Sequence, residues 1–417
     1  MSHLKTTAAW SGFLSATLLL TACGENSPDA ENTADAVPAE EEPDDVSMED
    51  VNEDVPGSTQ TFGWNLFDHL LQEEENQLLS PASISTALAM TMAGADGETK
   101  QEMTEVLSLH GLEDEEIDAS FQALITLLED TGSDVELAIA NSIWKREDYG
   151  FDDTFIEKME EEYQAQVEPL TDEEPINDWI SGQTNGLIED MISEVRPQTV
   201  MYLINAVYFQ GDWAEPFEES LTTEGTFTTS TGKEVDAMMM RRAEKEPVFL
   251  HSENDAFQAV SLPYGEEERW SMNVILPHEE EGSLQKTVDA FRNEDPLTFS
   301  EKVGNFRLPR FQMEEETTLN EPLIELGMPK AFNSAEADFS RMVEGGGIFI
   351  SEVLHNTFID VDETGTEAAA ATSVAMEESA PGYDFDMIVD RPFLFTVQDE
   401  ETGVLLFAGY VNKPEEG

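Results

Sequence analysis

Cysteine and basic residues are scarce in this sequence. Cys23 is the only cysteine among 417 residues, so no disulfide can form within the chain. There are 20 Lys and Arg against 90 Asp and Glu, which gives a formal net charge of −70. A surface with this charge repels phosphate groups, and the composition therefore excludes a nucleic-acid-binding protein.

The acidic residues are spread along the whole chain, and no single block holds the excess. A tail that recruits one basic partner would concentrate its charge in such a block. Dispersed acids with few lysines suit a protein that stays dissolved at very high salt, where charges are screened within about 3 Å at 1 M. The pattern predicts a protein from a halophile, and a specific basic partner is the alternative.

Motifs of the common enzyme classes are also absent. The sequence contains no His-Glu-x-x-His, no Gly-x-Ser-x-Gly, no phosphate-binding Gly-rich loop and no Cys/His cluster. Its six histidines are scattered, and none is spaced as a pair of metal ligands. Among 90 carboxylates, close pairs arise by chance. The sequence therefore predicts a protein without catalytic residues, metal or cofactor.

The apolar run near the N-terminus is too short to span a membrane. The run GFLSATLLL follows Lys5 and leads into Leu20-Thr21-Ala22-Cys23-Gly24. A run of this length is typical of the core of a signal peptide. Its Leu-Thr-Ala-Cys ending resembles the lipobox of bacterial lipoproteins, which implies a signal peptide over residues 1–22, a lipid on Cys23, and export to the cell envelope. A cysteine in a buried N-terminal helix is the alternative.

Residues 24–58 contain no aromatic residue, no Lys and no Arg, and have several prolines among many acids. Such a segment cannot bury enough apolar surface to order itself. The composition predicts a flexible acidic tether over 23–58, followed by a folded domain over 59–417.

The folded part begins with helical patterns and ends with strands. Apolar residues recur at helical spacing in TFGWNLFDHLLQEEE, and Ser80-Pro81 offers a capping residue and a first-turn proline for a second helix. Runs such as MYLINAVYFQGDW and SMNVILP have strand length and β-branched or aromatic residues. This order predicts an α+β fold.

Four segments together resemble the serpins, a family of serine protease inhibitors, from about residue 60 to the end. They are NQLLSPASISTALAMTMAGADGETKQEM, INDWISGQTNGLIEDMI, LINAVYFQGDWAEPF, and VLHNTFIDVDETGTEAAAATSVAM with the later DRPFLF. The resemblance implies a metastable α+β fold of three β-sheets and eight or nine helices. It also implies a monomer that exposes a reactive-centre loop as bait for a protease.

The resemblance further implies the mechanism of inhibition. The protease cleaves the loop and forms an acyl-enzyme, and the cleaved loop then inserts as a new strand of the largest sheet. The trapped protease is distorted before the ester can hydrolyse. The family's hinge matches Glu363, Gly365, Thr366, Glu367, Ala368, Ala369, Ala370 and Ala371.

Small side chains suit rapid insertion, because they have little bulk and little rotamer entropy to lose. Read with a period of two, one face of the segment carries only small or apolar side chains and the other carries the charges, as a strand with one buried face requires. The first face comprises Thr366, Ala368, Ala370, Thr372, Val374 and Met376. The hinge therefore favours an inhibitory serpin over a flexible linker.

Two further groups follow from the resemblance. Trp213 and Phe217 match the "breach", where the loop first enters the sheet. A small polar set, the "shutter", lies under the point where the sheet opens, and can pair again after strands separate. The shutter residues are Asn76, Ser80, Ser83, Asn205 and His355.

The cleaved bond is expected at Ser379-Ala380, with Glu378-Ser379 and Met376-Glu377 as alternatives. Ser379-Ala380 suits an elastase- or subtilisin-like serine protease with a small first pocket, and Glu378 would suit a glutamate-specific enzyme. No Lys or Arg lies between Thr366 and Arg391, which argues against a trypsin-like target. A non-inhibitory serpin that acts as a carrier or chaperone-like binding module, and a structural surface lipoprotein, are the competing functions.

Overall fold

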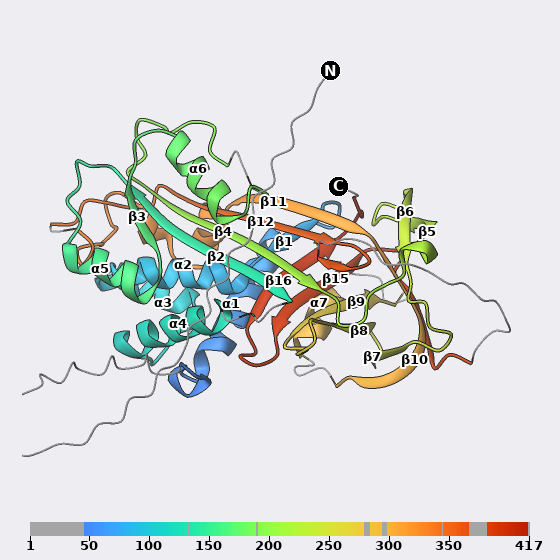
Figure 1. The fold of residues 1–417 in the computed structure, drawn as a ribbon. Helices are drawn as coiled ribbons and strands as arrows, with labels where there is room; N and C mark the ends of the chain where they lie inside the picture. Colours follow the sequence, from blue (N-terminus) through green and yellow to red (C-terminus); the bar gives the residue numbers. More distant parts are fainter. Residues whose placement is uncertain are drawn as a thin grey trace, which may run out of the picture. The chain divides into compact units, whose positions relative to one another are not determined.

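Helices dominate the first half of the chain and strands the second (Figure 1). The computed structural model describes residues 46–129, 131, 134–188, 191–278, 284–293, 298–343, 345–366 and 382–415. In this part of the chain the α-helices are α1 (Asp54–Leu70), α2 (Pro81–Ala93), α3 (Gly97–Val106), α4 (Asp114–Glu129), α5 (Asp153–Glu162), α6 (Glu174–Gln183), α7 (Leu284–Asn293) and α8 (Asn320–Leu326). Three short 3₁₀ helices are η1 (Met48–Asp50), η2 (Glu219–Leu221) and η3 (Pro329–Phe332).

The strands form two hydrogen-bonded networks. The six-stranded sheet has the order β11-β12-β4-β2-β3, with β13 on β4. Its strands are β2 (Val135–Lys145), β3 (Gln166–Pro169), β4 (Met201–Asp212), β11 (Phe311–Thr318), β12 (Glu352–Val361) and β13 (Gly365–Thr366).

The other network has the order β1-β16-β15-β9-β8-β7-β10-β6-β5, with β14 on β10. Its strands are β1 (Gln77–Leu79), β5 (Thr223–Thr228), β6 (Glu234–Met240), β7 (Val248–Glu253), β8 (Phe257–Tyr264), β9 (Trp270–Pro277), β10 (Ser300–Pro309), β14 (Phe385–Ile388), β15 (Phe393–Asp399) and β16 (Leu405–Val411).

Three sheets were predicted, but the strands form two networks, and the reason is the long strand β10. Residues Ser300 to Val303 pair with β7, and Leu308 and Pro309 pair with β6. β10 therefore joins what would otherwise be two separate sheets. The α+β class is confirmed.

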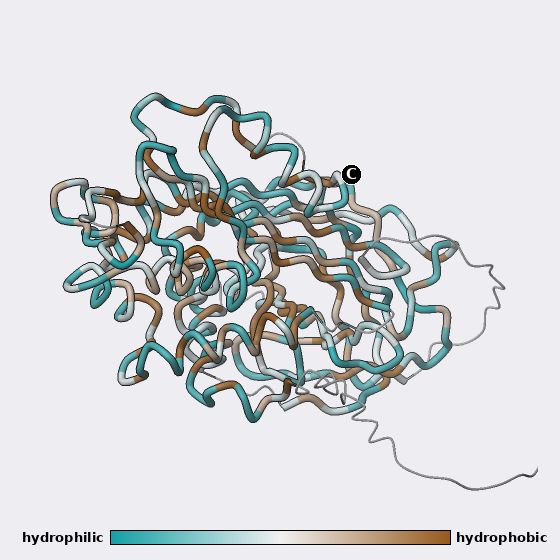
Figure 2. Tube along the Cα trace, turned by 60° about the vertical axis from the view of Figure 1, so that its left-hand side comes forward, coloured by the Kyte–Doolittle hydropathy of each residue, from teal (hydrophilic) through white to brown (hydrophobic). Residues whose placement is uncertain are grey.

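Nearly all residues of helix α2 are buried. Ser80 caps it, since its side chain accepts a hydrogen bond from Ser83 N, and Pro81 occupies the first turn as predicted. At its end, Gly94 allows close packing, because a Cβ there would lie 2.7 Å from Met342 Cε. Hydrophobic segments concentrate on the strands and helices of the interior (Figure 2).

The folded unit begins before residue 59, which corrects the predicted end of the tether. α1 starts at Asp54, and Val55 in its first turn is fully buried. Val51 is also buried, and Asn52 N donates a hydrogen bond to Ser120 Oγ on α4. These valines anchor the segment despite its acidic composition, so residues 46–58 belong to the folded unit.

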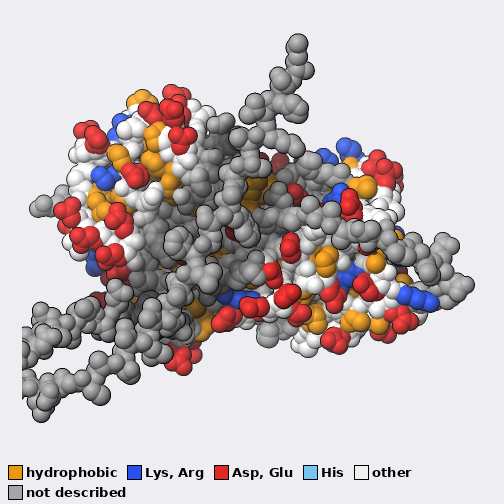
Figure 3. All heavy atoms as spheres, in the orientation of Figure 1, with side chains coloured by type: hydrophobic (Ala, Val, Ile, Leu, Met, Phe, Trp, Pro, Cys, Tyr) orange, Lys and Arg blue, Asp and Glu red, His pale blue; other side chains and the backbone are white. Residues whose placement is uncertain are grey.

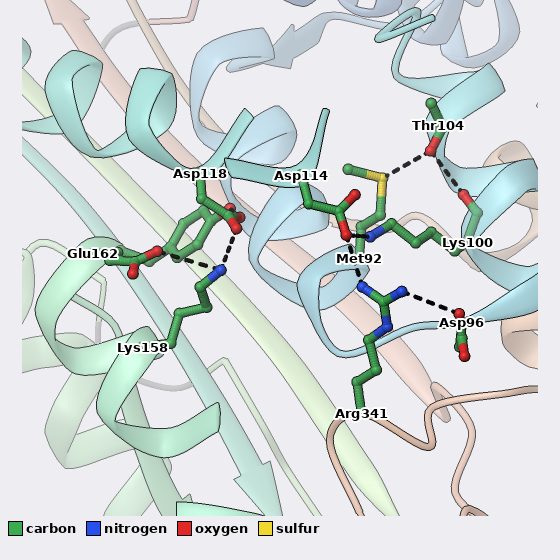
Figure 4. A network of polar contacts seen from close by, with 10 residues as sticks. Met92, Asp96, Lys100, Thr104, Asp114, Asp118, Lys158, Glu162 and Arg341 are labelled. Atoms are coloured by element: carbon green, nitrogen blue, oxygen red, sulfur yellow. Dashed lines mark hydrogen bonds and ion pairs between the residues drawn. The ribbon is translucent and has the colours of Figure 1, made fainter. Parts of the chain in front are cut away.

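Ion pairs link α3, α4 and α5 (Figure 4). Lys158 of α5 contacts Asp118 of α4. Asp114 of α4 lies 2.5 Å from Lys100 Nζ and 2.7 Å from Arg341 Nη1. These two cations lower the pKa of Asp114, Lys100 having the larger effect. Several of the few basic residues thus serve to join helices in an acidic protein.

Within the part of the chain that the structure describes, no helix has the length and apolar character needed to cross a membrane.

Candidate functional site

The central seam of the six-stranded sheet lies between the parallel strands β4 and β12 (Figure 1). Their pairing runs from Tyr202 opposite Glu352 to Tyr208 opposite Phe358. Both strands continue, β4 to Asp212 and β12 to Val361, but no further residues pair across the seam. The sheet is therefore open at this end.

The short strand β13 lies at the open end and contacts both β4 and β12. Gly365 pairs with Asp212 and Thr366 pairs with Gly211, in antiparallel register with β4. The backbones approach so closely that a Cβ on Gly365 would lie 2.0 Å from the carbonyl oxygen of Gly211. The first two residues of a further strand are already in place at the seam.

A tight turn at Asp362 reverses the chain between β12 and β13. Asp362 N donates a hydrogen bond to the carbonyl oxygen of Gly365 at 3.0 Å. Asp362 Oδ1 accepts hydrogen bonds from Thr364 N at 2.8 Å, Thr364 Oγ1 at 2.7 Å and Gly365 N at 3.2 Å. An aspartate that bonds to the backbone ahead of it stabilises a turn of this kind.

Glu363 fixes the turn to the neighbouring strands through its carboxylate, and the residue is only 4% exposed. Arg310 donates to both of its oxygens, from Nε to Oε1 at 2.9 Å and from Nη2 to Oε2 at 2.6 Å. Thr222 Oγ1 donates a further hydrogen bond to Oε1. A two-point arginine–carboxylate pair holds both position and orientation, so Glu363 clamps the hinge.

The two predicted breach aromatics hold the same turn. Trp213 N donates to the carbonyl oxygen of Thr364, and Phe217 N donates to that of Glu363, both at 2.8 Å. The indole Nε1 of Trp213 donates to the carbonyl oxygen of Asp362 at 2.9 Å. Both aromatic side chains are buried. Trp213 and Phe217 therefore hold the turn in place beside the open end of the seam.

Three carboxylates lie close together beside this turn. Burial raises the pKa of Asp212, and the nearby carboxylates of Asp134 and Asp362 raise it further. Asp212 is the residue that pairs with Gly365. The hinge thus sits beside a carboxyl group that takes up a proton more readily than an exposed aspartate does.

Four of the five predicted shutter residues meet under the paired part of the seam. Ser80 N donates to His355 Nε2 at 3.1 Å, so this nitrogen is unprotonated and the proton of the neutral ring lies on Nδ1. Nδ1 then donates to Asn205 Oδ1 at 2.6 Å, and Asn205 Nδ2 donates to Ser83 Oγ. Burial lowers the pKa of His355 from 6.5 to about 3.

The fifth residue, Asn76, lies elsewhere. Its Nδ2 donates to the carbonyl oxygen of Lys413 at 2.8 Å, and its Oδ1 accepts from the backbone N–H of Asn412 and Lys413 at 2.9 Å. Asn76 fastens the segment after β16, which corrects its assignment to the shutter. Asn141 on β2 takes part instead, since its Oδ1 accepts from Asn205 Nδ2 at 2.7 Å. A polar residue inside the buried run AIANSIW is the signal that could have found it.

The remaining predicted positions lie outside the described residues. They are Cys23, the hinge residues Glu367, Ala368, Ala369, Ala370 and Ala371, and the reactive-bond candidates Met376, Glu378, Ser379 and Ala380. Among the residues that are described, no group of three or more His, Cys, Asp or Glu is placed to hold a metal ion.

The pairing of β4 with β12 is open at one end, and the turn at Asp362 is held beside that end. This arrangement agrees with comparisons to known proteins. The family model described as "Serpin (serine protease inhibitor)" matches residues 57–414. The chain belongs to the serpin family. This serpin is 34% identical over 387 residues to an uncharacterized serpin-like protein of Thermococcus kodakarensis, covering 89% of each chain. It is 31% identical over 385 residues to the human leukocyte elastase inhibitor, covering 87% of this chain and 100% of the human protein.

The serpin fold is also that of a solved relative. The crystal structure of tengpin, a thermophilic serpin in its native state, matches with a TM-score of 0.79 and 31% identity, over 87% of this chain and 95% of tengpin. The eight α-helices of the described residues and the two strand networks agree with this fold.

Proposed function

We propose that this serpin is an inhibitor of the suicide-substrate type. It traps a serine protease as a covalent acyl complex while the cleaved reactive-centre loop inserts between β4 and β12. The observation that carries the proposal is the register at the seam. β13 already pairs with the open end of β4, and the segment that follows it in the sequence is made of small residues.

If the register of β13 continued, the residues that follow Thr366 would pair with β4 one by one, without a shift along the strand. Continued along β4, it brings Thr372 opposite Asn205 and Met376 opposite Met201, the first residue of the strand. The hydrogen bond from Asp362 N to the carbonyl oxygen of Gly365 sets the register of the turn between β12 and β13. Continued in the same way, that register would place Thr372 opposite His355. Asn205 and His355 are each other's present partners, so neither neighbouring strand has to shift along its length.

Physical chemistry favours this exchange. One parallel pairing between β4 and β12 is replaced by two antiparallel pairings, which are slightly more stable per residue. The strands separate by one further spacing of about 4.8 Å. Thr372 would meet polar shutter groups, and the alternate side chains that face the core are small or apolar. Polar groups released at the seam would therefore find new partners.

The test mixes the full chain, in high salt, with an elastase- or subtilisin-type protease and analyses the products on a denaturing gel. A band at the summed mass is expected, and the first residue of the released peptide identifies the cleaved bond. Thr372→Arg should turn the inhibitor into a substrate, because a charge at this position cannot enter between β4 and β12 at a competitive rate. Tyr383→Arg, an exposed position beyond the loop, should still inhibit. Clean cleavage of the wild type without the band, over several protease classes, would favour a non-inhibitory carrier.

The proposed target has a small first pocket, which accepts Ser379 of the bond Ser379-Ala380. The similarity to the human leukocyte elastase inhibitor supports this choice. A peptide that begins at Ser379 would instead identify Glu378 as the recognised residue, and one that begins at Glu377 would identify Met376.

We further propose that a lipid on Cys23 anchors the serpin to the cell envelope of a halophile. The Leu-Thr-Ala-Cys sequence and the net charge of −70 support this. Radioactive palmitate fed to the producing cells should label the wild type and leave Cys23→Ala unlabelled. Equal labelling of both chains would exclude the anchor at this residue.

A further inference from the structure

The returning end of the reactive-centre loop is anchored on β10 through Phe385. β14 pairs with β10 over a short stretch, from Phe385 opposite Gly304 to Ile388 opposite Arg307. The phenyl ring lies directly over Gly304, since a Cβ on this glycine would lie 2.0 Å from Phe385 Cε1. Phe385 is only 7% exposed. The first residue of β14 therefore buries a large apolar side chain, which holds the strand on β10.

A buried histidine of β7 packs against the same phenyl ring. The imidazole of His251 stacks on Phe385, with 4.1 Å between the ring centroids and 25° between the ring planes. Phe249, two residues before His251, meets the phenyl ring edge-on, with 6.1 Å between the centroids. His251 is fully buried. The position of Phe385 thus depends directly on the state of this imidazole.

His251 has an unusual partner, because the group that contacts it is a lysine. On the face that Figure 3 shows, acidic side chains outnumber basic ones, and lysines such as Lys100 and Lys158 contact carboxylates. Lys302 of β10 has no carboxylate within ion-pair distance among the described residues, and its Nζ lies 3.0 Å from His251 Nδ1. An ammonium group only donates hydrogen bonds. His251 is therefore neutral, with its proton on Nε2, which faces Gln258 Oε1 at 3.4 Å.

Protonation of His251 would remove the acceptor that Lys302 uses and would place two positive charges beside each other. Within the described part of the chain, the charged groups that act on the ring are Lys302 of β10 and Glu253 of β7 itself, while β8 contributes the neutral Gln258 and β14 the phenyl ring. Burial lowers the pKa of His251 below 6.5; Gln258 opposes this change, Lys302 adds to it, and Glu253 has the smallest effect. The packed arrangement therefore favours the neutral ring.

Both ends of the reactive-centre loop are held at the same end of the six-stranded sheet. β10 ends at Pro309, and β11 begins with Phe311, opposite Val361 of β12, where the pairing of β4 with β12 is open. β14 pairs with β10 and so lies on this side of the sheet, where Figure 1 places β10. The turn that carries the hinge lies at the same end.

The uncleaved loop is too short to insert fully while Phe385 is held. β4 is 12 residues long, so a strand that brings Met376 opposite Met201 extends about 37 Å from Asp212. The chain from Met376 back to Phe385 is nine residues long and spans at most about 32 Å. Cleavage removes this limit. Without cleavage, full insertion requires β14 to leave β10, and the packing of Phe385 on His251 opposes that step.

We infer that His251 is a positioning residue for the returning end of the reactive-centre loop, and that it makes retention of the uncleaved loop depend on pH. The inference rests on the proposed inhibitory function. Above pH 6.5 the ring is neutral whether β14 is held or released, and the anchor contributes fully. As the pH falls below 6.5, the released ring takes up a proton more readily than the held ring, so the anchor weakens. The serpin should then lose inhibitory activity without meeting a protease.

The experiment incubates the full-chain serpin without protease at pH 5.5 and at pH 7.5, in high salt, and returns samples to pH 7.5 at intervals. The active serpin that remains is measured as covalent complex with an elastase-type protease. Wild type should lose activity up to about tenfold faster at pH 5.5, the ratio expected for an ordinary histidine pKa in the released state. His251→Gln should lose most of this acceleration, because its amide oxygen can accept from Lys302 and does not titrate. His110→Gln, the same change at an exposed position, should keep it.

A second variant and a local measurement separate this anchor from other titrating groups, such as His355, which are the same in all these proteins. Lys302→Met should also reduce the acceleration, because the held ring then takes up a proton more readily, whereas Lys233→Met, at an exposed position, should not. Hydrogen exchange with mass spectrometry, corrected for the intrinsic rate at each pH, follows residues 384–389. These amides should lose protection at pH 5.5 in wild type and keep it in His251→Gln.

The outcomes separate this inference from the proposed function. An equal acceleration in wild type and His251→Gln overturns the inference, and so does inactivation at pH 5.5 while residues 384–389 stay protected. In both cases the proposed function stands if fresh serpin forms the covalent complex at pH 7.5. If His251→Gln does not fold, the comparison of Lys302→Met with Lys233→Met decides. If no protease yields a complex with fresh serpin, the proposed function fails, and hydrogen exchange alone tests the anchor.

Discussion

At the scale of single residues, His355 has one defined protonation state. Burial lowers the pKa of the folded residue to about 3, against about 6.5 when the chain is unfolded. Between these values the unfolded chain binds the proton more readily, so the contribution of His355 to stability is complete above pH 6.5 and is lost as the pH falls towards 3. Protonation would take from Ser80 N the acceptor that it uses in the fold.

The prediction is that His355→Gln loses stability less steeply than wild type below pH 6.5, by up to about 1.4 kcal/mol per pH unit. Urea titrations between pH 5 and 7.5 measure the difference directly. The many carboxylates also make stability depend on pH, but they are the same in all variants, so their contribution cancels when variants are compared. His69→Gln serves as the control, because it makes the same substitution at an exposed position. Identical slopes for the two variants would contradict the assigned pKa.

Glu363 and Arg310 should act as a coupled pair. Removing one partner leaves the other charge poorly compensated and costs about 3 kcal/mol for a buried pair, less here because the Arg310 side chain is 32% exposed. We expect the double variant Glu363→Gln/Arg310→Gln to lose less stability than the sum of the two single variants. Equilibrium unfolding of all four proteins gives the coupling free energy. A coupling below about 0.5 kcal/mol would mean that the clamp is not cooperative.

Residue identities at the site were partly predictable. Ser80, Ser83, Asn205 and His355 lie in sequence motifs that resemble those of the serpins, and the fold brings these four residues together. Asn76 sits in the same motif as Ser80 but on the far side of β1, where the C-terminal segment takes its hydrogen bonds. Such a partner, more than 300 positions away, is set by topology and leaves no local pattern in the sequence.

At the scale of elements, α6 covers the outer face of the seam. Ile176 and Ile180 of α6 belong to a small buried cluster with Ile204 of β4 and Leu354 of β12. The register of β13 would bring Ser373 between Ile204 and Leu354, directly beneath this helix. The inserting strand must therefore be small on this face as well, which the sequence meets with Ala371, Ser373 and Ala375.

Ser373→Phe should leave the native protein folded but slow insertion, since a phenyl ring would have to lift α6 from its cluster. The expected result is a rise in the moles of serpin consumed per mole of protease, with more cleaved serpin and less covalent complex. Gly382→Phe is the matched control, because a Cβ at Gly382 meets nothing within 4 Å. Unchanged stoichiometry for Ser373→Phe would exclude insertion in this register.

The elements themselves were easier to predict than their connections. Helical spacing and the Ser80-Pro81 cap anticipated α1 and α2. The start of α1 was missed because Val51 and Val55 are two apolar residues in a strongly acidic stretch, and only their burial reveals them. The sequence also did not predict that β10 pairs first with β7 and then with β6, because nothing in the sequence of a continuous strand indicates where its pairing partner changes.

At the scale of the whole molecule, two effects of salt oppose each other. Added salt weakens exposed ion pairs such as those of Arg341 with Asp96 and Asp114, but exposed pairs contribute only about 0–1 kcal/mol each. Added salt also screens the repulsion among the charges that make up the net −70. Repulsion rises with the square of the net charge, whereas the pairs are limited by 20 basic residues, so repulsion is the larger effect.

The serpin should therefore gain stability from salt, with a melting temperature that rises between 0.2 M and 2 M KCl. Salting-out of apolar groups also stabilises proteins, and a charge variant separates the two causes. Glu73, Glu74 and Glu75 form an exposed acidic run, and changing all three to Gln removes mutual repulsion without disturbing the core. This variant should melt higher than wild type at 0.2 M and converge with it at 2 M. A constant difference at all salt concentrations would attribute the salt effect to apolar hydration rather than to charge.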